Sequence, residues 1–140
     1  MDNVCKPKHL YLIPSNLDYL QLNEDKEFEE YLNNWSSLDN ERFSSKMQVK
    51  TLEINFSHEA FLEGVLTLIE PTEELILREH FKVGRFNLEK FHQTSENLAC
   101  KTLKLHMNTI NSIDFYYFNL IPIHRKTIFS RMLEGAFSEE

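Results

Sequence analysis

Apolar and polar residues alternate most clearly between Gln48 and Phe56. An extended chain turns successive side chains to opposite faces, so strict alternation predicts a half-buried strand. The apolar side would carry Leu52, Ile54 and Phe56, and the polar side Thr51, Glu53 and Asn55.

A helical pattern precedes this strand. Apolar residues recur there at the spacing of one helix face: Phe28, Tyr31, Leu32 and Trp35. This spacing predicts a helix over about residues 24–35. Asn23 can cap its first turn, and Glu24 and Asp25 suit the positive end of the helix.

Residues 63–83 admit two interpretations. Gly64–Ile69 and Leu75–Val83 can be two strands joined by a turn at Pro71, because proline favours the second position of a type I turn. The same residues can also form two helices separated by Pro71, with Thr72 as a cap. The alternation after Leu75 favours the hairpin, and the helical alternative stays open.

The later pattern predicts four more elements. Asn87 is placed to cap a helix over 87–98, and Lys101–Met107 alternates as a strand. Residues 112–121 are apolar on both sides, which is typical of a central strand. Residues 124–138 have helical spacing and predict a terminal amphipathic helix.

This order, α-βββ-α-ββ-α, predicts a single α+β domain over residues 1–140. We expect an antiparallel sheet of about five strands, packed with three helices. Residues 1–8 should be a loose N-terminal tail. Whether the apolar run His9–Ile13 joins the sheet stays open.

The charge balance bears on the partner. The formal net charge is −7 and the pI is about 5.4. Nucleic acids and anionic membranes are bound mainly by clustered lysine and arginine, so neither partner is expected. The start of the chain has no apolar stretch of signal-peptide length, and Cys5 and Cys100 make no disulfide framework. We expect a cytoplasmic protein.

The sequence offers little chemistry. Its six histidines are dispersed without a metal-ligand spacing, and its three glycines form no phosphate-binding loop. We therefore expect a non-enzymatic protein with no catalytic residues, no metal site and no cofactor.

The element order, small size and acidity resemble the class I chaperones of type III secretion. The resemblance implies a homodimer that holds the N-terminal segment of a secreted effector. It places the dimer interface at Phe91, Leu98, Leu103 and Leu105. It places the effector-binding patch at Phe28, Tyr31, Trp35, Leu52, Ile54 and Phe56.

Two alternatives stay open. The acidic surface also suits an immunity or inhibitor protein that neutralises a basic toxin or enzyme. A subunit of a larger viral or eukaryotic complex would instead expose apolar surface when alone.

Overall fold

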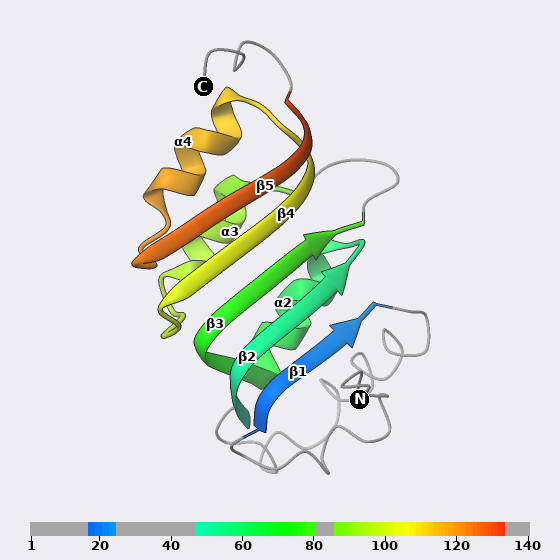
Figure 1. Ribbon diagram of the computed structural model, residues 1–140, viewed down its shortest axis with the longest axis vertical. Coiled ribbons are helices and arrows are strands. Elements are labelled where there is room, and N and C mark those ends of the chain that lie inside the picture. Colours follow the sequence, from blue (N-terminus) through cyan, green and yellow to red (C-terminus); the bar gives the residue numbers. More distant parts are fainter. Residues whose placement is uncertain (1–16, 25–46, 81–85, 134–140) are drawn as a thin grey trace.

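Figure 1 shows the computed structural model of the protein, whose described part is a parallel α/β sheet with helices packed against it. The structure describes residues 17–24, 47–80 and 86–133. Within these residues the chain forms five strands and three helices. In chain order they are β1 (Leu17–Asn23), β2 (Met47–Phe56), α2 (Glu59–Leu68), β3 (Ile69–Glu79), α3 (Leu88–Ser95), β4 (Thr102–Ile110), α4 (Ser112–Leu120) and β5 (Arg125–Leu133).

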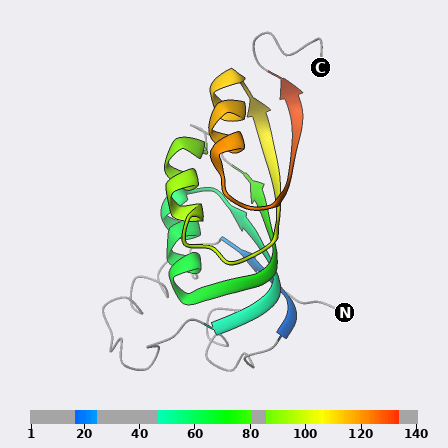
Figure 2. The same cartoon turned by 90° about the vertical axis from the view of Figure 1, so that its left-hand side faces the viewer.

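The sheet is parallel throughout and its spatial order is β1-β2-β3-β4-β5. Parallel neighbours need crossover connections, which are almost always right-handed. Because the order of the described strands never reverses, same-handed crossovers place the described helices on the same side. Figure 2 shows α2, α3 and α4 together on one face. One strand and one helix per unit is the arrangement of α/β repeat proteins.

The expected antiparallel α+β sheet is therefore wrong, and residues 63–83 show one reason. They form neither a hairpin nor two helices: α2 runs directly into β3 at Ile69. Pro71 lies inside β3 rather than in a turn. The pairing of β2 with β3 shifts register between Val49 and Thr51, opposite Pro71. Such an irregularity tolerates a residue that cannot donate a ladder hydrogen bond.

The two final elements were also predicted wrongly. Residues 112–120 are α4 rather than a strand, and 125–133 are β5 rather than a helix. The start of α4 is fixed by a capping box: the Asn111 side chain accepts from the Asp114 N–H, and Asp114 accepts from the Asn111 N–H. The sequence shows no amphipathic signal for this helix, because its apolar residues lie on all sides rather than on one face.

Three expected elements are confirmed: the strand at 48–56, the helix after Asn87 and the strand at 101–107. The segment Asn16–Leu22, which the sequence pattern left unclassified, contains β1. The helix expected at 24–35, the tail at 1–8 and the run at 9–13 lie outside the described residues, apart from Glu24.

The core lies between the sheet and the three helices. Two adjacent rows of apolar side chains cross β1–β4 in register and are almost fully buried: Leu20, Leu52, Leu75, Leu103 in one row, and Leu22, Ile54, Leu77, Leu105 in the other. Phe56 and Phe86 add an edge-to-face contact with ring centroids 5.0 Å apart. Helix α2 packs against β2 and β3, which carry parts of these rows, and α4 packs against α3.

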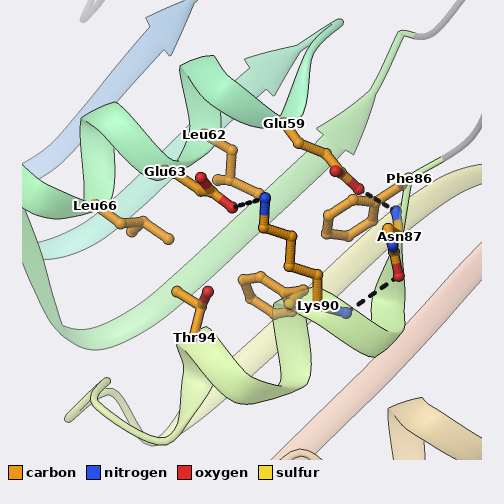
Figure 3. Close-up of a pocket in the computed structure, with 9 residues that line it drawn as sticks. Glu59, Leu62, Glu63, Leu66, Phe86, Asn87, Lys90 and Thr94 are labelled. Atoms are coloured by element: carbon orange, nitrogen blue, oxygen red, sulfur yellow. Dashed lines mark hydrogen bonds and ion pairs between the residues drawn. The ribbon is translucent and has the colours of Figure 1, made fainter.

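The contact between α2 and α3 is polar at its outer rim. Figure 3 shows Lys90 reaching Glu63, at 3.1 Å, and the backbone N–H of Asn87 donating to Glu59. The space enclosed beside them has a volume of about 10 Å³. That is about the space of one water molecule, which is too small for a ligand. The polar contacts at the rim therefore serve to hold α2 against α3.

Candidate functional site

The face of the sheet opposite α2, α3 and α4 is the main candidate surface. We call it the open face, because none of the described helices covers it. Three rows of side chains cross it in register. They are Tyr19-Thr51-Glu74-Thr102-Arg125, Gln21-Glu53-Ile76-Lys104-Thr127 and Asn23-Asn55-Arg78-His106-Phe129. Parallel sheets usually have both faces covered, so a polar, partly exposed face is unusual.

Hydrogen bonds tie three strands of this face together. The Tyr19 hydroxyl donates to Glu53 Oε1 at 2.5 Å, and Arg78 Nε donates to Glu53 Oε2 at 2.6 Å. Burial, helped by the hydrogen bond to Glu53, raises the pKa of Tyr19 to about 12, so the phenol stays protonated as a donor. Both oxygens of Glu53 are thereby engaged, and the Arg78 guanidinium is held in one orientation.

A hollow of about 270 Å³ lies at the carboxyl end of β3, beside the middle of β4 and β5. Arg78, His106 and Phe129 line it, together with His80 and Asn108. The His106 and Phe129 rings stack with centroids 4.5 Å apart and an interplanar angle of 14°. Phe129 is 44% exposed. The hollow thus combines a fixed cation, a titratable ring and an accessible aromatic surface.

His106 should titrate below the ordinary histidine pKa of about 6.5. Burial lowers its pKa first, and the charges of Arg78 and Lys104 lower it further against the opposing effect of Glu53. As the pH falls below 6.5, the unfolded chain takes up the proton first, so this group lowers the stability of the folded state there. NMR titration of the His106 ring should show the low midpoint, and Arg78→Gln should move it upward. An unchanged midpoint in that variant would contradict the coupling.

The open face differs in charge from the whole chain. Its three rows carry the basic residues Arg78, Lys104 and Arg125 and the acidic residues Glu53 and Glu74. Glu53 binds Arg78, and Glu74 lies 2.9 Å from Lys104. Arg125 has no ion pair within the described residues. The β3–β5 half of the face is therefore basic in a chain of net charge −7.

The residues expected to form interfaces lie elsewhere. Leu52, Ile54 and Phe56 are buried beneath the helices, and so are Leu103 and Leu105. Phe91 is buried in the same core, and Leu98 is half-buried against it. A partner could reach these side chains only if a helix moved away. Phe28, Tyr31 and Trp35 lie outside the described residues.

Sequence reasoning missed the residues that line the hollow, although part of the signal was present. Arg78 and His106 occupy polar positions of the alternating segments Leu75–Val83 and Lys101–Met107, and the structure pairs them in neighbouring strands. The alternation within each segment could not show that these two strands are parallel neighbours, and an antiparallel sheet was expected instead. Phe129 was assigned to a helix, and β1 was not recognised, so Tyr19 and Phe129 were not connected to them.

The described residues contain little sign of other chemistry. Burial raises the pKa of Cys100 to about 11, so its thiol stays protonated and is a poor nucleophile. Within these residues no three histidine, cysteine, aspartate or glutamate side chains gather where they could hold a metal ion. None of the described helices is long and apolar enough to span a membrane.

The strand order has a further chemical consequence. Open α/β sheets bind nucleotides at a point where the strand order reverses and the helices part to both faces. The five described strands follow one another without a reversal. This part of the chain therefore has no such crevice. Comparison with protein-family models, with curated proteins and with solved structures finds no match.

Proposed function

We propose that this chain is a protein-binding module that receives a carboxylate-bearing segment of a partner protein on its open face. The observation that carries the proposal is a parallel sheet with all its described helices on one side. Repeat proteins of this kind commonly bind their partners on such extended surfaces.

The anchor of the interaction is the hollow lined by Arg78, His106 and Phe129. Arginine and aromatic side chains dominate the energetics of protein interfaces. Glu53 holds Arg78 through Nε, and within the described residues no group is bonded to the guanidinium's terminal amino groups. A carboxylate can therefore pair with them, and an apolar neighbour in the same segment can cover Phe129.

The charge of the face supports an acidic segment rather than a basic one. Arg78, Lys104 and Arg125 outnumber the two glutamates, both of which are already paired with a cation. A basic toxin would meet this surface with like charge, so an inhibitor that acts through the open face is the less favoured alternative. The secretion-chaperone resemblance loses support, because it rested on an element order that the chain does not have.

A selection of random peptides displayed on phage tests the proposal. Peptides that bind the wild-type chain should be enriched in aspartate or glutamate next to an apolar residue. Their affinity for Arg78→Ala and for Phe129→Ala should fall at least about tenfold each, as expected for interface hot spots. Affinity should rise as the pH falls from about 7.5 toward 6, because a bound carboxylate favours protonated His106.

The matched control is Glu96→Ala, which changes an exposed residue at the end of α3 on the covered side. It should leave peptide affinity unchanged. Selected peptides that lack carboxylates, or that bind Arg78→Ala and Glu96→Ala equally well, would refute the proposed anchor.

A further inference from the structure

Helix α4 exposes an apolar stripe on the helical side of the molecule, away from the open face. Ile113 is 63% exposed, Tyr116 61% and Leu120 46%. Their spacing places them along one side of the helix, opposite the buried Asp114 and Phe118. Among the described residues, the other large apolar side chain this exposed is Phe129 of the hollow. A helix with apolar residues all round is normally buried on every side.

The stripe carries no charge. The one charged residue of α4, Asp114, is buried and held in the capping box with Asn111. A strongly basic or acidic partner would find no complementary charge on α4. A second copy of this chain, repelled elsewhere by its net charge of −7, meets no like charge on the stripe itself.

The stripe continues into a hollow of about 280 Å³ between α4 and the start of α3. Ile113 and Tyr117 line it from α4, and Leu88 and Glu89 from α3. Tyr117 is fixed on both sides: Tyr116 meets it edge to face at 5.1 Å, and His92 stacks on it at 5.6 Å. An apolar side chain from outside can therefore enter beside a rigid aromatic pair.

The spacing along the stripe is nearly symmetric about its centre. Ile113 lies three residues before Tyr116, and Leu120 lies four residues after it. When two α4 helices pack antiparallel about a two-fold axis, Ile113 faces Leu120 of the second copy and the two Tyr116 side chains meet at the centre. A two-fold interface requires this self-complementarity.

We infer that the chain forms a two-fold dimer through the α4 stripe, with a second copy of itself as the occupant. This dimer differs from the one that the chaperone resemblance implied, because it leaves the buried Phe91, Leu103 and Leu105 in the core. It does not depend on the proposed function of the open face. Three side chains cover less than the roughly 800 Å² per partner of a standard interface, so the dissociation constant should be micromolar.

Sedimentation equilibrium of the full chain tests the inference over about 1 to 300 µM, which brackets a micromolar constant. The mass should rise from 16.7 kDa toward twice that value. Tyr116→Lys places two like charges at the centre of the dimer and should keep the chain monomeric. Ile113→Lys should do the same, and the thermal melting of both variants reports whether they still fold.

The matched control is Thr127→Lys, which adds the same charge on the open face. It should dimerise like the wild type. A wild-type chain that stays monomeric at about 300 µM would overturn the inference. The same result is expected if another segment of the same chain covers Tyr116, and it would equally overturn the dimer. A dimer that survives in both folded α4 variants would overturn it as well.

Discussion

Leu77→Ala should lower the free energy of unfolding by about 2–5 kcal/mol, the usual cost of a cavity at a buried leucine. Leu77 is 1% exposed, and it lies in register between Ile54 and Leu105 in the row beneath the helices. The neighbours in that row belong to rigid strands and cannot collapse into the space. Urea denaturation monitored by circular dichroism measures the loss.

The matched control is the preceding residue, Ile76, which lies in the same strand but points to the open face. Ile76→Ala removes the same number of carbon atoms from a half-buried position and should cost only about 1 kcal/mol. The difference between the two losses in unfolding free energy shows how much more deeply the helical face of β3 is buried than its open face. Equal losses would mean that both faces of β3 are covered, and the open face would not exist.

Glu79→Ala should destabilise the fold by about 2–5 kcal/mol, because it leaves two backbone donors without their acceptor. Glu79 is buried at the end of β3. Its Oε2 accepts from the Phe86 N–H at 2.8 Å, and its Oε1 accepts from the Asn108 N–H at 2.9 Å. One carboxylate thus joins the end of β3 both to the segment that leads into α3 and to β4.

Glu79→Gln retains one acceptor oxygen and should recover about half of that loss. Glu73→Ala is the control, since Glu73 is an exposed carboxylate of the same strand, 3.9 Å from Lys101. Removing an exposed pair of this kind should change the stability by less than about 0.5 kcal/mol. Chemical denaturation measures the free energy of unfolding of the three variants. If Glu79→Ala lowered it no more than Glu73→Ala does, the Glu79 carboxylate would not act as a bridge between β3, β4 and the segment before α3.

Local pattern predicted individual elements where one face of the element is buried. The strand at Gln48–Phe56 alternates because α2 covers one side of it only, and Asn87 caps α3 with its side chain, as expected. The pattern failed in α4, where apolar residues lie on all sides. It failed again in β5, where Ile128 and Phe129 fit a helical spacing as well as a strand.

The sheet topology could not be read from the sequence, because equivalent positions of neighbouring strands do not recur at a fixed spacing. Leu75 follows Leu52 by 23 residues and Leu103 follows Leu75 by 28, yet the three are direct neighbours in the sheet. No fixed period reveals them as equivalent. The site depends on this register: Arg78, His106 and Phe129 become neighbours only when β3, β4 and β5 lie parallel and in order.

Methyl NMR with a soluble paramagnetic agent measures whether the open face of the sheet is exposed to solvent. The methyl groups of Ile76 should relax much faster in the presence of the agent than those of its neighbours Leu75 and Leu77, which lie beneath the helices. Faster relaxation at Ile76 would mean that solvent reaches the open face, and that a partner can reach the hollow lined by Arg78, His106 and Phe129. Equal protection of all three residues would show that both faces of β3 are covered, and it would contradict the one-sided sheet and the binding surface proposed on it.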